Sequence, residues 1–600
     1  MPKNSYHEAD TEANESLLSH SEGSRHIRSQ SWSNAKRPYV LAILLSGNRR
    51  RVLIKIFLVL FAFSLGFVAL ISFFKPRISL VLENSETWKK QTPDDTDLAF
   101  PPHYTALRTR IKNLPQHNTS LPFPEGRNGR YVKFSSQISQ LGWNNVLNEI
   151  LLNSHLAYRS NRAYVFTEYD WKPDYYPWAE DLMYEKPAKT PLMALMSGPV
   201  TGGPWYDGVK PAPAAAFTTP KELKELGQVS DAPPRSVAHT YWEEVCPLHK
   251  RKIISTSDVK PWHKFNTNER DGKEIFEYWL RLLTDPKFFD EIALSHLEHN
   301  KKVKGDGCIE ILPAPRSEDN FPQVFDLWMW GCERVLGLWD EFKNSPIASV
   351  GLGTSEVVER CIKRNLHLFS RHRKSGSNPP LKVDADSDVE LDVDDLDRRQ
   401  TADSEDPFAR VLAVHIRRGD YKAACQDLAD YNSTYYSWNQ FSFFPDHFAP
   451  PPYTPGKEKG SGNQSPENVK IYNSHCLADD GAIVKKVRAG RNDWEKETGH
   501  AGGKEHYLDT LFLLTNERDM EWLGKLKKEF IEEDGWKNVV ISSLEIVYGD
   551  AQEKDVGMAV DMDLARRAAV FIGNGFSSFT SNIIHRRLVD GKIPMSIRFF

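Results

Sequence analysis

Two arginines stand at the end of a short apolar run in the second half of the chain. Val411 to Ile416 has the continuous apolar character of a strand buried in a parallel sheet. Arg417 and Arg418 follow it directly, and Gly419 lets the backbone turn there. Guanidinium groups bind phosphate through paired hydrogen bonds, and ligands of open α/β sheets lie at the carboxyl ends of strands. The pattern predicts a pyrophosphate site; a solvated loop with salt bridges to Asp420 is the alternative.

A second strand followed by a turn lies near the end of the chain. Val570 to Ile572 predicts a strand, and residues 573–575, Gly-Asn-Gly, turn the chain into a helix that starts with hydroxyl side chains, including Ser577 and Ser578. Backbone amides at a helix start and nearby hydroxyls bind phosphate or ribose oxygens. This turn is therefore a second candidate for contact with a nucleotide.

An earlier segment has the pattern of a β-loop-α-β unit. Tyr131 to Phe134 and Ala163 to Thr167 predict strands, and the apolar spacing of Trp143 to Tyr158 predicts the helix between them. Asn144 and Asn145 fall at the start of that helix, where free amides attract anions. Helix capping is the alternative role for either side chain.

The elements that position these residues alternate between strand and helix. Leu508 to Thr515 and Val539 to Ser542 predict strands, whereas Asn516 to Phe530 and Asp561 to Ala569 predict helices. Together with the β-loop-α-β unit, they indicate an α/β protein with two Rossmann-like regions.

Composition and charge limit the classes of partner. The chain has 600 residues and a net charge of −4, with both signs mixed along it. Because binding of nucleic acid needs a basic surface, we expect no nucleic-acid partner. The 16 Trp, 21 Tyr and 31 Phe supply ample material for a core.

Residues 53–74 are predicted to form a single transmembrane helix that acts as a signal anchor. Ile56 to Phe74 contains no charged residue and is long enough to cross a bilayer; a buried core helix is the alternative. The basic residues before it place residues 1–52 in the cytoplasm, as a disordered tail, and the large C-terminal part in the lumen. The run starts too far from Met1 for a cleaved signal peptide. Residues 75–128, with few periodic segments, are predicted to be a stem.

A lumenal location fits the sequons and the cysteines. Asn118, Asn432 and Asn463 each begin an Asn-x-Ser/Thr sequence. All six cysteines follow the predicted membrane helix, and an even count permits three disulfides in many connectivities. We expect Cys425 to pair with Cys476, because this bond would close the insertion between them. The wide and irregular spacing of the cysteines argues against a zinc site.

Two further segments are compositionally unusual. Residues 373–408 contain an acidic run in which Asp-x-Asp sequences occur many times, so that composition rather than a metal site explains them. We expect a disordered insertion there and no metal. Residues 170–260 are dense in aromatic residues and prolines. They either line an acceptor site or pack over the sheet.

Three motifs in order resemble the GDP-fucose protein O-fucosyltransferase family, in particular a fungal-type O-fucosyltransferase-like protein. HIRRGDY at 415–421 resembles the His-x-Arg motif of fucosyltransferases that use GDP-fucose. FIGNGFSSFTSNI at 571–583 is similar to the family's C-terminal donor-binding motif, and LGWNNVLNEILLNSHLAYRSNRAYVF at 141–166 to its first loop and helix. The resemblance covers about residues 130–600.

The resemblance implies a GT-B architecture, in which two Rossmann-like domains face each other across a cleft. Residues 129–372 would form the acceptor-side domain and residues 409–600 the domain that binds the nucleotide sugar. The family implies inverting, metal-independent transfer of fucose from GDP-fucose, without a further cofactor, to a Ser or Thr of a secretory-pathway protein. A Golgi or endoplasmic reticulum membrane would hold the enzyme. Transfer to a glycan hydroxyl, or an inactive lumenal carbohydrate-binding relative, are the alternatives.

The family also implies roles for individual residues. Arg417 would contact the pyrophosphate and steady the departing GDP, while Asn145 would lie near the sugar and the acceptor. The other donor contacts implied, or suggested by position, are His415, Arg418, Asp561, Ser577, Ser578 and Phe579. The loop from Ser135 to Gly142 contains no carboxylate, so this motif provides no general base.

Overall fold

The computed structural model describes Asp95 and residues 97–135, 142–203, 233–255, 271–293, 303, 305–312, 333–349, 351–370, 406–419, 421–457, 459–460, 462–503 and 505–600. The expected membrane helix at 53–74, the tail at 1–52 and the acidic run up to residue 405 lie outside these residues. Within them, no helix combines the length and the apolar character needed to span a bilayer.

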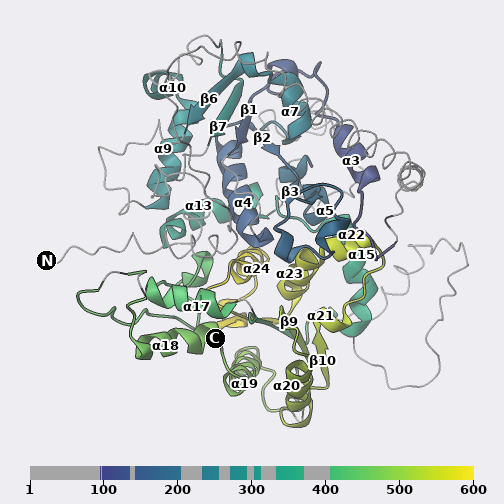
Figure 1. The fold of residues 1–600 in the computed structure, drawn as a ribbon, viewed down its shortest axis with the longest axis vertical. Helices are drawn as coiled ribbons and strands as arrows, with labels where there is room; N and C mark the ends of the chain where they lie inside the picture. The colour runs from purple at the N-terminus through teal and green to yellow at the C-terminus, as the bar shows by residue number, and fades with distance from the viewer. Residues whose placement is uncertain are drawn as a thin grey trace, which may run out of the picture. The chain divides into compact units, whose positions relative to one another are not determined.

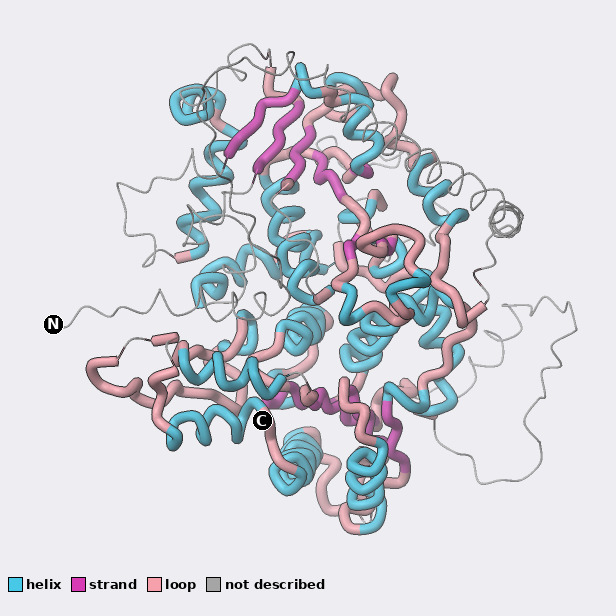
Figure 2. The backbone as a smooth tube through the Cα atoms, in the orientation of Figure 1, coloured by secondary structure: helices cyan, strands magenta, loops and turns pink. Residues whose placement is uncertain are grey.

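The first sheet is parallel and has the strand order β5-β2-β1-β7-β6. Its strands run side by side at the top of Figure 2. They are β1 (Tyr131–Phe134), β2 (Ala163–Phe166), β5 (Val237–Ala238), β6 (Arg251–Ser255) and β7 (Cys308–Leu312). Tyr131 of the central strand β1 pairs with Ala163 on one side and Cys308 on the other. A separate antiparallel pair joins β3 (Tyr169–Asp170) and β4 (Lys189–Thr190).

The second sheet is also parallel and has the order β10-β9-β8-β11-β12. Its strands are β8 (Val411–Ile416), β9 (Thr510–Thr515), β10 (Asn538–Ile541), β11 (Val570–Gly573) and β12 (Ile597–Phe599). All residues of the central strand β8 are buried, as its apolar run predicts. The two sheets confirm the prediction of an α/β protein with parallel sheets.

Helices cover these sheets (Figure 1). Those in the first half of the fold are α3 (Thr105–Lys112), α4 (Trp143–Arg159), α5 (Leu192–Leu195), α7 (His239–Val245), α9 (Gly272–Thr284), α10 (Pro286–Ala293), α13 (Trp339–Lys343), α14 (Pro346–Ser349) and α15 (Glu356–Asn365). Those in the second half are α17 (Tyr421–Asp430), α18 (Pro466–Cys476), α19 (Asp480–Glu497), α20 (Met520–Glu532), α21 (Ser542–Glu545), α22 (Ala551–Asp555), α23 (Gly557–Arg567) and α24 (Ser578–Val589).

Short 3₁₀ turns connect these elements. They are η1 (Gly126–Asn128), η2 (Pro173–Tyr175), η3 (Glu180–Leu182), η4 (Pro199–Thr201), η5 (Leu248–Lys250), η7 (Glu333–Leu338), η8 (Leu366–Leu368), η9 (Ser437–Gln440) and η10 (Pro594–Ser596). One of them, η9, contacts helix α24 and the turn η7.

The amphipathic helices follow from capping and apolar spacing. In α20, the Asp519 carboxylate accepts hydrogen bonds from the amides of Glu521 and Trp522 and so caps the first turn. Leu523, Leu526 and Phe530 fall on one face and are the helix's buried residues. Helix α4 differs, because it is buried on nearly every side and contacts α24 as well as β1 and β2.

The predicted stem at residues 75–128 is wrong for its described part, which packs on the folded protein. The backbone carbonyl of Asp95 accepts a hydrogen bond from the amide of Ala551 at 2.8 Å. The hydroxyl of the fully buried Tyr104 donates to Asp555 at 2.7 Å. The expected boundary at residue 372 also divides elements that bind each other, since Arg360 in α15 pairs with Glu553 in α22. By its contacts, the described chain belongs to one compact unit.

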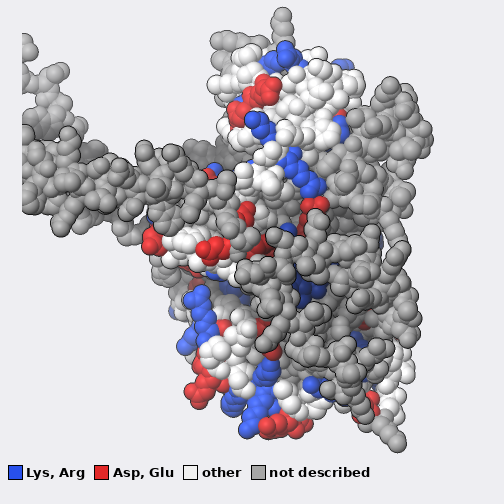
Figure 3. All heavy atoms as spheres, turned by 90° about the vertical axis from the view of Figure 1, so that its right-hand side faces the viewer, with Lys and Arg blue, Asp and Glu red and all other residues white. Residues whose placement is uncertain are grey.

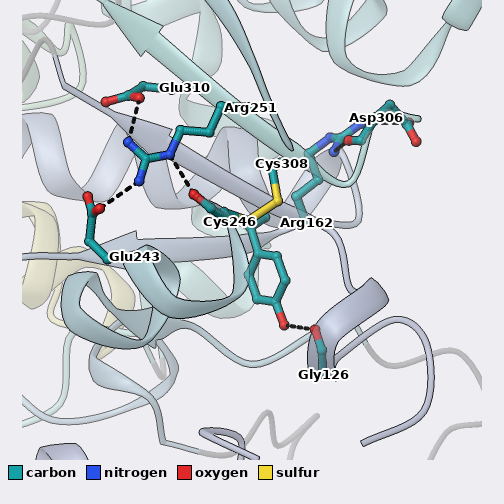
Figure 4. Close-up of a disulfide and its surroundings, with 9 residues drawn as sticks. Gly126, Arg162, Glu243, Cys246, Arg251, Asp306, Cys308 and Glu310 are labelled. Carbon is teal, nitrogen blue, oxygen red and sulfur yellow. Dashed lines mark hydrogen bonds and ion pairs between the residues drawn. A yellow bond between two sulfur atoms is a disulfide. The ribbon is translucent and has the colours of Figure 1, made fainter. Parts of the chain in front are cut away.

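Two disulfides are formed in the described residues. The Cys425–Cys476 bond confirms the expected pair. The Cys246–Cys308 bond was not predicted; beside it, Arg251 donates to the Cys246 carbonyl at 2.6 Å (Figure 4). Cys361 is buried and forms no disulfide, and burial raises its pKa to about 12. The expectation that a third bond is possible therefore fails for Cys361.

The aromatic segment around residues 169–178 mostly packs inward. Trp171 and Trp178 are buried, and Tyr176 lies between them with ring centroids 5.4 Å from each. Tyr175 alone of these rings is exposed. On the face in Figure 3, the described Lys and Arg side chains lie among Asp and Glu side chains, so that face carries mixed charge.

Candidate functional site

The two predicted turns lie at the same edge of the second sheet. Strands β8 and β11 are parallel neighbours, and Val414 pairs with Ile572. Each strand ends within two residues of this pair, so Arg417 follows one strand where the Gly-Asn-Gly turn follows the other. Both turns therefore lie at the sheet edge where ligands of open α/β sheets bind.

His415 connects the two turns. It is buried, and its Nδ1 lies 3.1 Å from the hydroxyl oxygen of Thr580 in the first turn of α24. Its ring centroid is 4.7 Å from that of Phe579. Burial, helped by the nearby Arg417 charge, lowers the pKa of His415 to about 3. The imidazole is therefore neutral at physiological pH and acts through hydrogen bonds and packing.

Arg417 is half-buried and lies over the ring of Tyr421, with its Cζ 5.3 Å from the ring centroid. The Tyr421 hydroxyl donates to the carbonyl of Phe576 at 3.0 Å. Phe576 directly precedes Ser577, so this pair of contacts places the guanidinium beside the second turn. Sequence reasoning missed Tyr421 as a support, although it closes the HIRRGDY motif.

Arg418 has different partners. Its Nε pairs with Glu517 at 3.1 Å, and its Cζ lies 4.3 Å from the ring centroid of Trp522. Its amide donates to the Asn516 side chain at 2.9 Å. These contacts connect Arg418 to the segment after β9 and neutralise its charge there. For Arg418, the alternative of a loop with salt bridges therefore holds, although its partner is Glu517. Asp420, the partner expected from the sequence, lies outside the described residues.

The backbone of the second turn packs closely against neighbouring side chains. A Cβ on Gly575 would lie 2.3 Å from the ring of Tyr435, and one on Gly573 would lie 2.4 Å from the methyl carbon of Thr580. Neither position has room for a side chain. Asn574 accepts a hydrogen bond from the amide of Phe576 at 3.0 Å, which fixes the turn locally.

The hydroxyl side chains lie at the start of α24. Ser577 is buried, and Ser578 and Phe579 are half-buried. Ser577 precedes the helix, but its side chain does not cap it. The first amides of this helix carry a partial positive charge and point along its axis. A phosphate at this position would meet these amides and the Ser577 hydroxyl.

Asp561 lies inside α23 and is not a helix cap. It accepts a hydrogen bond from the hydroxyl of Ser542. Burial raises the pKa of Asp561 to about 7, because the charged form loses hydration. The carboxyl group is thus poised between its two protonation states near neutral pH.

Asn145 lies in the first turn of α4, the helix that packs against β1 and β2 of the first sheet. It does not cap this helix, whose preceding residue is Gly142. Its neighbour Asn144 accepts two hydrogen bonds from the side chain of Asn582 in α24, through its carbonyl and its side-chain oxygen, both at 3.0 Å. These contacts bring Asn145 to the helix that starts with Ser578. Asn582 was not predicted, since its partner is distant in sequence.

The sequon asparagines differ in exposure. Asn118 is exposed, whereas Asn432 and Asn463 are half-buried. No cluster of three or more His, Cys, Asp or Glu side chains suited to a metal ion occurs among the described residues.

No protein-family model and no curated protein matches the chain. Among solved structures, it is similar to POFUT1 in complex with GDP-fucose, with 11% identity, a TM-score of 0.38, and coverage of 79% of this chain and 99% of that one. POFUT1 in complex with GDP gives 11% identity, a TM-score of 0.37, and 79% and 98% coverage. A mutant of Arabidopsis thaliana FUT1 in complex with GDP gives 9% identity, a TM-score of 0.27, and 81% and 74% coverage.

Proposed function

We propose that this protein is an inverting glycosyltransferase that transfers fucose from GDP-fucose to a hydroxyl group, in a Ser or Thr of a secretory-pathway protein. The observation that carries this proposal is the meeting of Arg417 and the Ser577 turn at the carboxyl ends of the adjacent parallel strands β8 and β11. A cation, a helix start and a hydroxyl at one sheet edge suit a nucleoside diphosphate.

The diphosphate would be the leaving group. Breaking the bond between the sugar and GDP leaves negative charge on the β-phosphate. A guanidinium and helix amides that are already oriented stabilise this charge more in the transition state than in the ground state. Arg417 and the start of α24 supply both, so the step needs no metal ion. His415 would stay neutral and hold Thr580 and Phe579 beside the nucleotide.

Asp561 would bind the base. A guanine offers two neighbouring N–H donors, which a carboxylate accepts together. Binding these donors favours the charged form of Asp561 and so opposes the effect of burial on its pKa. The Ser542 hydroxyl donates to the same carboxylate and would hold its orientation.

Asn145 would act on the acceptor side. It belongs to α4, which packs against β1 and β2 of the first sheet. Its side-chain amide can bind the hydroxyl groups of the sugar or the acceptor without taking up a proton. An acceptor oxygen that attacks from the side opposite GDP would invert the anomeric centre. Asn145 would thus orient the sugar or the acceptor, and Arg417 would stabilise the negative charge on the departing GDP.

We also propose that the protein is a single-pass type II protein of the Golgi or endoplasmic reticulum membrane, anchored by residues 53–74. Two disulfides in the described residues support an oxidising compartment for this part of the chain. The exposed Asn118 of the first sequon is accessible to a glycan.

The proposed reaction is tested with the full chain in detergent. It is incubated with GDP-fucose, GDP-mannose, UDP-glucose and UDP-galactose, with and without EDTA, and release of the nucleoside diphosphate is measured. Release from GDP-fucose alone, unchanged by EDTA, is the expected result. Equal release from UDP sugars, or loss of release with EDTA, would contradict the donor or the metal-free step.

A further inference from the structure

The Cys425–Cys476 disulfide joins two helices that both contact the second turn of the proposed site. Cys425 lies within α17, and Cys476 is the last residue of α18. Helix α17 starts at Tyr421, whose hydroxyl donates to the Phe576 carbonyl at 3.0 Å. At the end of α18, the Cys476 carbonyl accepts a hydrogen bond from the Asn574 side chain at 2.8 Å.

These two hydrogen bonds hold neighbouring residues of one turn. The Asn574 side chain donates to Cys476 and also accepts from the amide of Phe576. Asn574 therefore connects the end of α18 to Phe576. Tyr421 of α17 binds the same residue through its carbonyl. Ser577 is the next residue, and its hydroxyl is one of the proposed phosphate contacts.

Aromatic packing completes the connection. Phe576 is buried, and its ring centroid lies 5.8 Å from that of Tyr472 in α18 and 5.1 Å from that of Phe448. The turn thus rests on α18 through an apolar contact as well as through Asn574. Separation of α18 from α17 would disturb both contacts.

Tyr421 has a second role in this arrangement. Its ring lies under the guanidinium of Arg417, while its hydroxyl holds the Phe576 carbonyl. One side chain therefore sets the position of the cation relative to the turn that supplies the hydroxyl and the helix amides. A shift of α17 would move Arg417 and the turn apart.

We propose that the Cys425–Cys476 bond is a brace for the donor site: it holds α17 and α18 together so that Tyr421 and Asn574 act as positioning residues for the diphosphate-binding turn and Arg417. This inference rests on the proposed function, because it takes GDP as the ligand of the turn. It predicts that loss of this disulfide weakens GDP binding beyond any general loss of stability.

The second disulfide of the chain provides the matched control. Cys246–Cys308 closes a loop of similar length, with a sequence separation of 62 against 51, so the loss of either bond frees the unfolded chain to a similar degree. It joins β7 of the first sheet to the residue that follows α7. The two double variants are Cys425→Ala/Cys476→Ala and Cys246→Ala/Cys308→Ala.

GDP binding of both double variants is measured by titration calorimetry on the full chain, at a temperature well below their unfolding midpoints. We expect the Kd for GDP to rise about tenfold or more in the Cys425→Ala/Cys476→Ala variant and about twofold or less in the control. Equal changes in the two variants would overturn the proposal. A wild-type chain that does not bind GDP would instead contradict the proposed function.

A milder pair of variants applies if a disulfide variant fails to fold. Tyr421→Phe keeps the ring under Arg417 and removes the hydroxyl that donates to the Phe576 carbonyl. Tyr472→Phe removes a comparable buried hydrogen bond, from α18 to the Ser433 carbonyl at 2.8 Å. We expect Tyr421→Phe to weaken GDP binding about threefold to tenfold, and Tyr472→Phe by less. An unchanged Kd in Tyr421→Phe would overturn the role of this residue.

Discussion

The imidazole Nδ1 of His415 and the hydroxyl of Thr580 lie 3.1 Å apart, and this contact joins the end of β8 to the first turn of α24. Because burial holds the pKa of His415 near 3, the pair is a neutral hydrogen bond and not an ion pair. Its contribution is therefore to fix two side chains at the proposed site, independently of pH over the physiological range.

Replacing Thr580 with Val keeps the shape of the side chain and removes this hydrogen bond. We expect a loss of about 1 kcal/mol in the free energy of unfolding and GDP binding that is about threefold weaker or more. Thr510→Val is the control, since Thr510 is a buried threonine in β9 whose hydroxyl contacts Asp509. Denaturant unfolding and calorimetry measure the two effects. A normal Kd in Thr580→Val would show that the imidazole does not need this anchor.

Arg417→Ala tests the leaving-group role. We expect kcat/KM for transfer or hydrolysis of GDP-fucose to fall by a factor on the order of 10² or more, because the charge on the β-phosphate loses its cation. The control is Arg410→Ala: Arg410 lies just before β8, at the other end of the strand, and pairs with Asp509 at 2.9 Å. Steady-state kinetics of both variants decide the matter, and a near-normal rate for Arg417→Ala would refute its role.

Arg417→Lys refines the same test. Lysine keeps the charge but loses the planar fork and its contact over Tyr421. A rate between those of the wild type and Arg417→Ala is expected. If Lys restores the full rate, charge alone is sufficient and paired hydrogen bonding to the diphosphate is not required.

The raised pKa of Asp561 leads us to expect that GDP binding depends on pH. Its pKa of about 7 in the free protein means that half of the molecules carry a neutral carboxyl group there, whereas guanine selects the carboxylate. The affinity for GDP should therefore fall about tenfold between pH 8 and pH 6. Asp561→Asn should bind more weakly and lose this dependence. Calorimetry across the pH range measures it; an equally steep profile in Asp561→Asn would assign the titration to another group.

Sequence patterns located β1, β2, β8, β9, β10, β11 and the two turns because each is a local signal, whereas β5, β6, β7 and β12 were not predicted. The apolar run of β8 and the Gly-Asn-Gly turn after β11 are each contained within a few residues, and the structure has both. The expected pair Cys425–Cys476 also formed. These features needed no knowledge of which distant segments meet.

The supports of the site depend on distant partners and were missed. Nothing in the local sequence marks the partners of Thr580 and Asn582, and only the fold shows that they meet His415 and Asn144. The helix α3 in the predicted stem was missed for another reason. None of its own residues is fully buried, and only Leu107 and Ile111, one turn apart, pack against the core, which is too short an apolar pattern to predict a helix. The buried Tyr104 precedes the helix in a left-handed conformation.

The raised pKa of Asp555, a residue outside the donor turn, leads us to expect that the stability of the fold depends on pH. It is buried, and one of its oxygens accepts hydrogen bonds from Tyr104 at 2.7 Å and Thr190 at 2.5 Å. Burial raises its pKa from 3.8 to about 7. The folded state therefore holds a proton that the unfolded state releases. Its stabilising effect is complete below about pH 4 and is lost as the pH rises to about 7.

Asp555→Asn should remove this dependence, which amounts to on the order of 4 kcal/mol across that range. The asparagine oxygen can still accept from Tyr104 and Thr190. Chemical denaturation at pH 5 and pH 8 measures the slope. If the wild type and Asp555→Asn show the same slope, the carboxyl group does not titrate in this range in the folded protein.

Glycosylation tests the lumenal location. Asn118 is exposed, and its side-chain oxygen accepts the amide of Ser120 at 2.9 Å, so a glycan on its nitrogen can extend into solvent. Asn432 is half-buried with a φ of 53°, and its side-chain oxygen lies 3.5 Å from the Tyr472 hydroxyl, which leaves less room for a glycan. In a secretory host, we expect a glycosidase-sensitive mass that Asn118→Gln reduces more than Asn432→Gln does. Because glycans are added only in the lumen, a full chain without any such mass would contradict the proposed orientation in the membrane.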